Sequence, residues 1–376
     1  MHIGLIRQRY APDGGAERFV ARALAALQAQ GVSLTLIARQ WERSESFNVI
    51  TCDPFYIGSL WRDWGFARCV RNVLARRSLD LVQSHERIAG CDIYRAGDGV
   101  HREWLRQRRR TLGLSGKLAL ALNPHHHYVK AAEKRLFNSP RLRAVICNSH
   151  MVKQEIRRYF GVADEKLHVI YSGVDTNQYH PGLRRYRSAL RAQHHIPQDA
   201  PLFLFVGSGF ERKGVSLLLD AMARLPSESY LMVVGRDKKM RLFLSRAAKL
   251  NIADRVCFAG AQQDVKPFYG AADALVLPTL YDPFPNVVVE AMASGLPVIT
   301  SHKCGAAELI RNGDNGFVCD ALDKTALVKS MRTLLEQNQR ERMAVSARKS
   351  TESLTLETMS KQLMTLYDQV IIEKRA

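Results

Sequence analysis

The feature that most constrains the fold is an alternation of short apolar runs with helical patterns, which the chain shows twice. In the first half, residues 3–6 (IGLI) lead into the loop YAPDGGAERF, and the helical pattern ARALAALQAQ then ends at Gly31. Residues 32–38 (VSLTLIA) form the next apolar run. The order strand, loop, helix and strand opens a doubly wound parallel sheet. The runs at 79–84 and 144–149 fit further strands of the same sheet.

The same alternation restarts after residue 197. PLFLFVGSGF predicts a strand and a turn, GVSLLLDAMARL a helix, and YLMVVGRD another strand and turn, and RVCFAGA, ADALVLPT and LPVITS continue the series. We therefore predict an α/β protein of two Rossmann-like domains, with a linker at 172–187, where glycine, proline and asparagine gather. The predicted parts are residues 1–175, residues 176–355, and an amphipathic C-terminal helix at 356–376 that is able to pack back on the first domain.

Two such domains leave a cleft between them. In open parallel sheets, ligands bind beyond the carboxyl ends of the strands, near helix N-termini. The loops expected at those ends are 10–16, 85–101, 207–214, 235–239 and 279–287.

Net charge limits the classes of partner. The 376 residues carry a formal charge of +19, and residues 1–180 hold 28 Lys and Arg against 16 Asp and Glu. Such a chain favours polyanions, which include nucleic acid, acidic lipid and phosphorylated glycan. No apolar run approaches the ~18 residues of a transmembrane helix, and the first apolar run is too short for a signal peptide.

The cysteines carry no recognisable motif. Their number, seven, is odd, and no CxxC pair occurs. A disulfide framework or a zinc site is therefore not expected. We expect reduced thiols, as in a cytosolic protein.

Two loops have the composition of phosphate sites. Gly14 and Gly15 follow the first strand and precede a helix, so the backbone is able to approach an anion at the helix N-terminus; a plain tight turn is the alternative. Arg212 and Lys213 follow the strand of VGSGFERKG, and two adjacent cations there suit a diphosphate. A solvated charge pair is the alternative, but the neighbouring glycines favour phosphate.

The segment YDPFPNVVVEAMASGLPVI holds two acids in an otherwise apolar setting. Pro285 and Asn286 begin a predicted helix, and Gly295 closes it. Glu290 lies about one turn into this helix, and its carboxylate is able to accept hydrogen bonds from two vicinal hydroxyls, such as those of a ribose. Asp282 precedes the helix and faces whatever lies beyond its N-terminus. A salt bridge at the helix surface is the alternative for Glu290.

These residues resemble the retaining glycosyltransferases of family 4, which have the GT-B fold of two Rossmann-like domains facing a central cleft. Their hallmark is two acids separated by seven residues, followed by Glu-Ala-small-x-Gly-x-Pro-Val. Here Asp282 precedes EAMASGLPV, and it departs from the usual first Glu. The Gly-Gly pair, the Arg-Lys pair and the VGRDK turn follow in family order over essentially the whole chain. Within the family, FVGSGFERKGV, VGRDK and RIAGCDIYRAGDGV are most like the lipopolysaccharide core glucosyltransferase I type.

The resemblance implies a role for each matching residue. Glu290 would bind the ribose of a UDP-sugar, and Arg212 and Lys213 would stabilise the departing diphosphate with help from Gly14 and Gly15. Asp98 would orient the acceptor or steady the reacting carbon, although an Asp in a GDG turn is common without function; His101 is a weaker candidate nearby. The residues implied to hold the donor sugar are Asp282, Phe284, Pro285, Asn286 and Val287, and those implied to frame the base are Arg236 and Asp237.

The resemblance also implies the chemistry. Negative charge develops on UDP as the glycosidic bond breaks, and fixed cations and helix N–H groups lower the barrier. No metal and no other cofactor is expected, because no Asp-x-Asp motif is present and relatives of this fold usually need none. Retention would follow from attack on the face of the leaving group, with a phosphate oxygen taking the proton of the acceptor.

A basic stretch at 101–145 holds eleven Lys and Arg against two Glu, with interleaved tryptophan and leucine. This composition suits an anionic membrane surface, suits nucleic acid, and is also that of a merely solvated helix. With a glycolipid acceptor implied, we expect membrane docking and no nucleic acid. His125, His126 and His127 are interpreted as surface residues. The residues expected to face the membrane are Trp104, Leu105, Arg106, Arg108, Arg109 and Arg110.

The sequence therefore predicts a cytoplasmic enzyme, peripheral on the inner face of the membrane. It would move a hexose, in the first instance glucose, from a UDP-sugar to a lipopolysaccharide core or related glycolipid. A UDP-sugar epimerase of the same fold and a basic nucleic-acid-binding protein are the alternatives.

Overall fold

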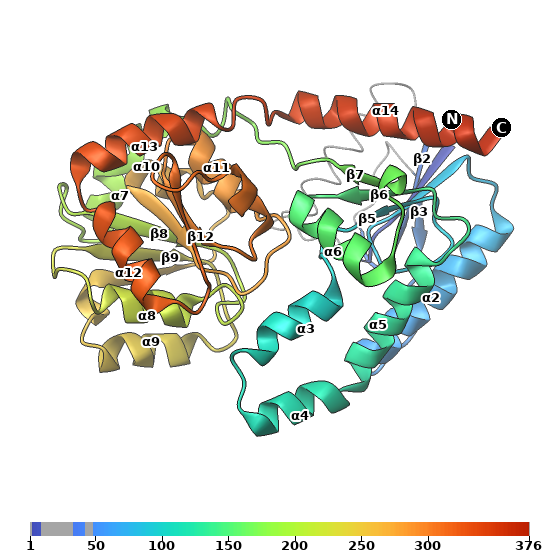
Figure 1. Ribbon diagram of the computed structural model, residues 1–376, viewed down its shortest axis with the longest axis horizontal. Coiled ribbons are helices and arrows are strands. Elements are labelled where there is room, and N and C mark those ends of the chain that lie inside the picture. Colours follow the sequence, from blue (N-terminus) through green and yellow to red (C-terminus); the bar gives the residue numbers. More distant parts are fainter. Residues whose placement is uncertain (1, 9–32, 42–47, 376) are drawn as a thin grey trace. The chain divides into compact units, whose positions relative to one another are not determined.

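The structure, a computed structural model, describes residues 2–8, 33–41 and 48–375, and the chain divides into two compact units (Figure 1). Unit 1 is Met1–Ser172 with Glu357–Ala376, and unit 2 is Gly173–Leu356. Each unit is built on its own parallel sheet. The prediction of an α/β protein with two Rossmann-like domains is confirmed.

Unit 1 has a sheet of seven described strands in the order β3-β2-β1-β4-β5-β6-β7, all parallel. The order reverses between β1 and β4, which is where open α/β sheets bind ligands. The strands are β1 (His2–Ile6), β2 (Ser33–Ala38), β3 (Asn48–Thr51), β4 (Leu81–Ser84), β5 (Ile93–Arg95), β6 (Ala144–Cys147) and β7 (Leu167–Val169). The helices are α2 (Gly58–Arg76), α3 (His101–Arg109), α4 (Leu114–Leu122), α5 (Pro124–Phe137), α6 (His150–Phe160), a short turn η1 (Asp164–Lys166), and α14 (Leu356–Arg375).

Two apolar cores cover the two faces of this sheet, because side chains of a strand alternate between faces. Ile3 and Leu5 of β1 pack with α14, which lies along unit 1 in Figure 1, whereas Ile6 packs with α2 and α6. The Tyr367 hydroxyl of α14 donates to Gln83 Oε1 of β4 at 2.6 Å. The C-terminal helix is therefore an integral layer of unit 1.

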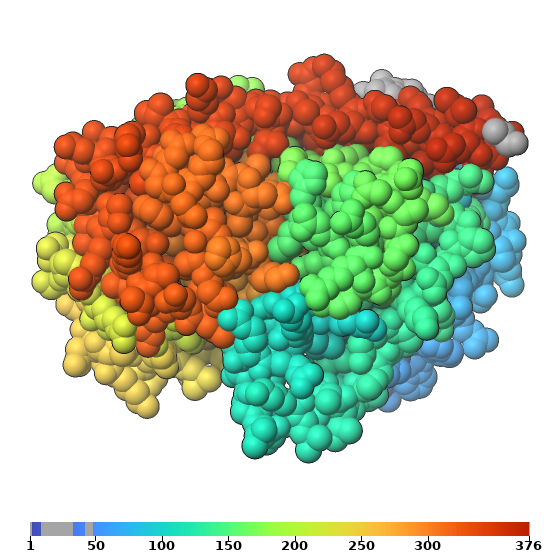
Figure 2. Space-filling view, viewed as in Figure 1, coloured from blue at the N-terminus to red at the C-terminus, as the bar shows by residue number. Residues whose placement is uncertain are grey.

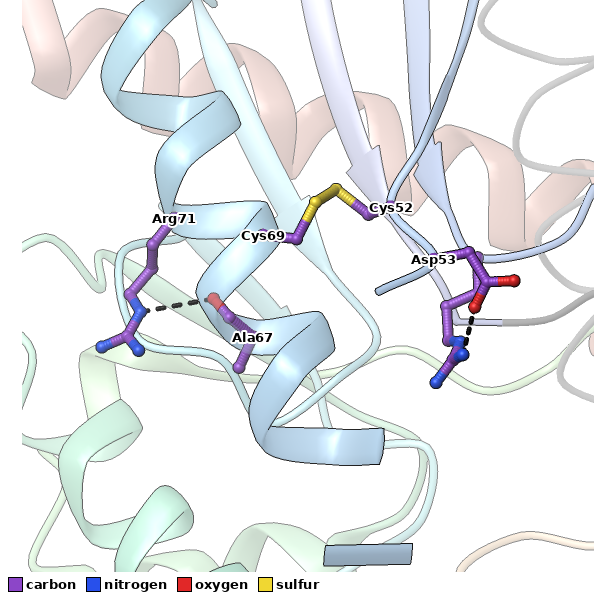
Figure 3. The surroundings of a disulfide bond; sticks show 6 residues. Cys52, Asp53, Ala67, Cys69 and Arg71 are labelled. Carbon is purple, nitrogen blue, oxygen red and sulfur yellow. Dashed lines mark hydrogen bonds and ion pairs between the residues drawn. A yellow bond between two sulfur atoms is a disulfide. The ribbon is translucent and has the colours of Figure 1, made fainter. Parts of the chain in front are cut away.

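Cys52 and Cys69 form a disulfide that joins the end of β3 to α2 (Figure 3). Their Cα atoms lie 5.7 Å apart. The expectation of seven free thiols is wrong for this pair, because no spacing motif signals a contact made only when the helix packs beside the strand. Cys91, Cys147, Cys257, Cys304 and Cys319 are free.

Unit 2 has six described strands in the order β10-β9-β8-β11-β12-β13, again all parallel, with the reversal between β8 and β11. The strands are β8 (Leu202–Val206), β9 (Tyr230–Val234), β10 (Val256–Gly260), β11 (Ala274–Leu277), β12 (Val298–Ser301) and β13 (Gly316–Cys319). The α-helices are α7 (Arg187–Gln193), α8 (Val215–Met222), α9 (Met240–Lys249), α10 (Lys266–Ala271), α11 (Asn286–Ala293), α12 (Lys324–Thr333) and α13 (Gln337–Lys349), and the short turns are η2 (Pro181–Tyr186), η3 (Ala253–Arg255) and η4 (Gly305–Leu309).

Candidate active site

The loop from β8 to α8 lies against the segment that follows β11, because these two strands are neighbours at the reversal of the sheet. Arg212 Nη1 donates to the carbonyl of Tyr281 at 2.9 Å, and Leu280 N donates to the carbonyl of Arg212 at 2.9 Å. Gly214 has a φ of +80°, and a Cβ there would lie 2.1 Å from the Pro278 carbonyl oxygen. The predicted cations thus stand where the fold creates a ligand crevice.

Asp282 brings its carboxylate onto both of these cations. Its Oδ2 lies 3.2 Å from Lys213 Nζ and 3.4 Å from Arg212 Nη1, and its side chain is only 11% exposed. The Asp282 backbone is held from both sides, since its N–H donates to Lys303 O at 2.9 Å and its carbonyl accepts from Gly305 N at 2.8 Å. The three residues therefore form one rigid ionic cluster.

Gly207 makes room for this cluster. A Cβ at Gly207 would lie 2.7 Å from Cδ and 3.0 Å from Nζ of Lys213. The lysine side chain consequently crosses directly over the backbone at the end of β8, where only glycine leaves space. This contact gives a physical reason for one of the glycines that marked the loop in the sequence.

Glu290 lies on α11 and is 4% exposed. The interpretation as a surface salt bridge is therefore excluded. The Tyr269 hydroxyl of α10 donates to Glu290 Oε2 at 3.0 Å, and Ser294 Oγ donates to the Glu290 carbonyl at 2.8 Å. Tyr269 thus orients the carboxylate, and no local spacing could have signalled a residue that reaches Glu290 from another helix.

The other residues implied for the donor lie in the same unit. Phe284 is buried. Pro285 is the N-cap of α11, so the helix begins at Asn286, four residues after Asp282. The N-terminal end of a helix favours negative charge. Asp237 accepts from the backbone N–H of Phe210 at 2.7 Å and so ties the turn after β9 to the loop of the cations. Arg236 in the same turn is exposed.

Asp98 lies in unit 1, in the turn after β5, with its side chain 57% exposed. Its Oδ2 is 3.5 Å from Arg87 Nη1. Arg87 also donates to Gly99 O at 3.2 Å and to Glu133 Oε1 at 2.9 Å. This arginine, which no sequence motif marks, anchors the turn, because it bonds both Asp98 and the carbonyl of Gly99.

His101 begins α3 beside this turn. Its backbone N–H donates to Glu133 Oε1 at 2.8 Å, and its Nε2 lies 3.1 Å from His126 Nδ1. Burial, and secondarily the charge of Arg87, lowers the pKa of His101 to about 3. The imidazole is therefore neutral at physiological pH.

Two of the three histidines interpreted as surface residues, His125 and His126, are half-buried at the surface of unit 1. His125 Nε2 lies 3.0 Å from Asp63 Oδ2 of α2, a carboxylate remote in sequence. His127 is exposed, as expected. Among the residues that the structure describes, no three His, Cys, Asp or Glu side chains gather as a metal site. Gly14 and Gly15 lie outside the described residues.

The residues expected to face the membrane lie on α3, with Arg110 directly after it, and α4 follows in the same basic stretch. Both helices lie at the surface of unit 1 (Figure 2, teal). Trp104 and Leu105 are only partly exposed, and Arg108 lies over the Trp104 ring at 5.8 Å. Of the four arginines expected to face the membrane, Arg106, Arg109 and Arg110 are exposed and Arg108 is half-buried. Within α3 and α4, the most exposed apolar side chains belong to α4, namely Leu114 (87%), Leu118 (61%) and Leu122 (70%). No helix in the described ranges has the length and apolar character needed to cross a bilayer.

The family model described as glycosyl transferases group 1 matches residues 187–350, and that described as glycosyltransferase family 4 matches residues 13–178. The chain is 26% identical over 346 residues to the lipopolysaccharide glucosyltransferase WaaG of Escherichia coli (strain K12), covering 90% of both chains.

Solved structures agree on the fold. A crystal structure of WaaG, a glycosyltransferase involved in lipopolysaccharide biosynthesis, aligns over 96% of this chain and 98% of its own with a TM-score of 0.84 at 24% identity. Anabaena HepE in complex with UDP-glucose aligns over 98% of this chain and all of its own, with a TM-score of 0.74 at 22% identity. Both similarities establish the architecture of two Rossmann-like domains.

Proposed function

The chain belongs to the group 1 and family 4 glycosyltransferases of GT-B fold, and we propose that it transfers glucose from UDP-glucose to a lipopolysaccharide core or related glycolipid, with retention of anomeric configuration. The observation that carries this proposal is the cluster of Arg212, Lys213 and Asp282 at the reversal of the unit 2 sheet, on the same unit as buried Glu290. The glucosyltransferase named WaaG, similar over most of the chain, supports the acceptor class and the sugar.

In this proposal Glu290 accepts hydrogen bonds from the two ribose hydroxyls, and Tyr269 holds it in the necessary orientation. Arg212 and Lys213 face the diphosphate, whose negative charge grows as the bond to the sugar breaks. Because Asp282 already holds both cations in place, little reorganisation is needed at that moment. The N-terminal end of α11, at Phe284–Val287, and Asp282 hold the sugar, while the turn of Arg236 and Asp237 frames the base.

Asp98 of unit 1 is proposed to orient the acceptor hydroxyl or to steady the reacting carbon. Its position in a turn anchored by Arg87 gives it a defined place with an accessible carboxylate. Retention would result from attack on the face that the diphosphate leaves, with a phosphate oxygen accepting the proton. Gly14 and Gly15 are proposed to contact the same diphosphate.

The decisive experiment incubates the purified protein with a panel of UDP-sugars and truncated lipopolysaccharide core acceptors, followed by mass spectrometry and NMR of the product. We expect one α-linked hexose added to the acceptor from UDP-glucose. Conversion of the UDP-sugar without consumption of an acceptor would instead identify an epimerase. Binding of oligonucleotides without binding of UDP would identify a nucleic-acid-binding protein.

We also propose that the enzyme works on the cytoplasmic face of the membrane, where α3 and α4 dock. Each Lys or Arg near an anionic bilayer contributes about 1 kcal/mol, and this attraction falls off within a Debye length. The exposed leucines of α4, spaced by four residues on one side of the helix, suit shallow insertion better than the partly buried Trp104 and Leu105. Docking would bring a lipid-linked acceptor to the surface of the unit that carries Asp98.

This docking predicts binding to vesicles that requires anionic lipid and weakens with salt. Replacing Arg106, Arg108, Arg109 and Arg110 with Gln should reduce activity on vesicle-borne acceptor and spare transfer to a soluble fragment. The matched control replaces exposed cations of unit 2 and should change neither activity: Lys249, Lys329, Arg342 and Lys349. Equal binding to neutral and anionic vesicles would refute the docking role.

A further inference from the structure

A second apolar surface of unit 1 lies between the two cysteines of the disulfide. The turn after β3 and the first two turns of α2 expose large side chains that a soluble domain usually buries. The opposite side of the same helix packs into the core through Phe66 and Val70. The exposed residues are Phe55 (74%), Ile57 (70%), Leu60 (37%), Trp61 (42%) and Trp64 (42%). We call them the aromatic surface.

The aromatic surface has a defined shape. The Cys52–Cys69 bond ties both ends of the segment together, as Figure 3 shows. Gly65 lets the turn lie against the helix, because a Cβ there would stand 3.2 Å from Pro54 Cγ. The Phe55 and Trp61 rings meet edge to face, with centroids 5.8 Å apart. These contacts hold the apolar side chains together outside the core.

Positive charge accompanies the aromatic surface. Residues 51–77 contain five arginines and two aspartates. Both aspartates are already paired, Asp53 with Arg39, and Asp63 with Arg62 at 2.8 Å and with His125 at 3.0 Å. The local field at this surface is therefore set by arginines, which favour an anionic partner.

Trp61, Trp64, Arg68 and Arg71 are all exposed and follow one another at spacings of three and four residues. They therefore share one side of α2. The Arg68 guanidinium lies over the Trp64 ring at 5.6 Å. Tryptophan next to arginine on a helix side is the composition of elements that rest at the boundary between lipid headgroups and acyl chains.

Two observations favour a membrane, and not a second copy of the chain, as the partner of the aromatic surface. A twofold contact would bring two copies of the same arginine-rich surface together, at an electrostatic cost. In addition, a hydrogen bond between His125 Nε2 and Asp63 Oδ2 joins α2 to the start of α5, whose first residue lies two positions after Leu122, the last residue of α4. The aromatic surface is thus linked within unit 1 to the helix already proposed to dock.

We propose that the aromatic surface is a second contact with an anionic bilayer, in which Trp61 and Trp64 insert at headgroup depth while Arg68 and Arg71 bind lipid phosphates. This inference rests on the proposed membrane docking of α3 and α4. Two separated contacts fix the orientation of unit 1 on the membrane, whereas a single helix leaves it free to pivot.

The test measures partition onto vesicles of phosphatidylcholine with and without phosphatidylglycerol. Arg68→Gln with Arg71→Gln should weaken binding to anionic vesicles about thirtyfold, if each arginine acts near the surface. Trp61→Ser with Trp64→Ser should weaken it about tenfold or more. The control, Leu242→Ser with Leu244→Ser, replaces apolar side chains of α9 that are 64% and 47% exposed and should leave binding unchanged. Transfer to a soluble acceptor should be unchanged in all three.

A second measurement does not depend on the folding of the serine variant. In a protein with Trp41→Phe and Trp104→Phe, Trp61 and Trp64 are the remaining tryptophans. Brominated phosphatidylcholine in anionic vesicles should quench their fluorescence, and vesicles without bromine should shift it to the blue. Absence of both effects in a protein that still binds the vesicles would overturn the inference.

The outcomes separate this inference from the proposed function. If the Gln variant of the α3 arginines loses binding while the Trp and Arg variants of α2 keep it, the aromatic surface is not a membrane contact and docking through α3 and α4 stands. If the wild type ignores anionic vesicles, both are wrong. A dimer in light scattering that the Trp variant converts to a monomer, with vesicle binding intact, would assign the surface to a second copy and overturn the inference.

Discussion

Arg212 and Lys213 of unit 2 differ from the exposed arginines of unit 1 in both burial and pairing. Lys213 is 9% exposed and shares the carboxylate of Asp282 with Arg212. Arg68 and Arg71 of α2 are exposed, and no carboxylate among the described residues forms an ion pair with them. A buried cation in an ion pair has a fixed position, which suits stabilisation of a transition state. An exposed cation keeps its side-chain conformational freedom, which suits binding to a charged surface such as an anionic bilayer.

The buried cluster of unit 2 and the exposed arginines of unit 1 also differ in how much free energy a substitution removes. Removing one partner of a buried ion pair leaves the other charge uncompensated and is costly. Removing an exposed charge changes stability little, because water and salt already screen it. The cluster in unit 2 should therefore respond to single substitutions, and the surface of unit 1 only to several at once.

The largest effect is expected for Lys213→Ala. The ammonium faces charge that develops only as the diphosphate departs, so kcat should fall about 10²- to 10³-fold while the KM for the donor changes much less. Arg212→Ala should act in the same direction. Steady-state kinetics over a range of UDP-glucose concentrations measures both constants.

The matched control is Lys239→Ala in the same unit, whose ammonium pairs with Glu211 at 3.5 Å with both side chains more than half exposed. Its kcat should remain within a factor of two or so of wild type, as for most surface ion pairs. A Lys213 variant that changed only KM would show that the cation binds the ground state and transition state equally.

The next effect concerns Glu290→Ala. Loss of the charge-assisted hydrogen bonds to ribose should weaken UDP binding by on the order of 2–3 kcal/mol, measured by titration calorimetry. Tyr269→Phe removes only the hydroxyl that orients the carboxylate and should cost about 1 kcal/mol. Unchanged UDP affinity in the Glu290 variant, with a normal melting temperature, would remove Glu290 from the ribose site.

Much of the fold was predictable, because it follows from local patterns. The strands β8 and β11 are fully apolar runs, β1 and β9 are apolar after their first residue, and all four are followed by glycine or loop signals, as buried parallel strands are. The strands β3, β7 and β13 were missed, since they have three or four residues and include exposed or half-buried positions. Such short runs carry too little periodicity to be distinguished from loops.

The residues of the candidate site were predictable where they stand in a local sequence motif. They were not predictable where they depend on contacts between elements far apart in the sequence. Arg212, Lys213, Asp282 and Glu290 stand in motifs of consecutive residues. Tyr269 on Glu290, Arg87 on Asp98, and Asp63 on His125 join elements that are far apart along the chain. The Cys52–Cys69 bond belongs to the same class, because only the packing of α2 beside β3 brings the two thiols together.

A smaller effect is expected for the dependence of stability on pH. It concerns His101 of unit 1, a partly buried histidine beside the exposed arginines of α3. In the folded protein the pKa of His101 is lowered to about 3, so its imidazole stays neutral down to about that pH. In the unfolded chain the imidazole binds a proton near pH 6.5. As pH falls below 6.5, His101 should therefore reduce the free energy of unfolding by up to about 1.4 kcal/mol per pH unit, until about pH 3.

Urea unfolding at neutral pH and at pH 4.5 measures this slope. His101→Gln should flatten the pH dependence relative to wild type, and the same change at exposed His150 should not. Parallel pH profiles for wild type and His101→Gln would show that burial of this imidazole does not govern acid sensitivity.

The last prediction is an expected absence of effect, and it follows from the fixed cations of unit 2. In the proposed reaction Arg212 and Lys213 stand where a divalent ion would otherwise meet the diphosphate, and a second positive centre there would be repelled by them. Activity with UDP-glucose should therefore survive EDTA, and added magnesium or manganese should not raise it. The informative comparison is Lys213→Ala under the same conditions, because loss of the ammonium leaves Asp282 with Arg212 as its only remaining cation of the cluster and removes one positive charge beside the diphosphate. Partial rescue of that variant by magnesium, with wild type indifferent to the metal, would show that the lysine occupies the position of a metal ion. Loss of wild-type activity on chelation, restored by either metal, would contradict the assignment of leaving-group stabilisation to side chains.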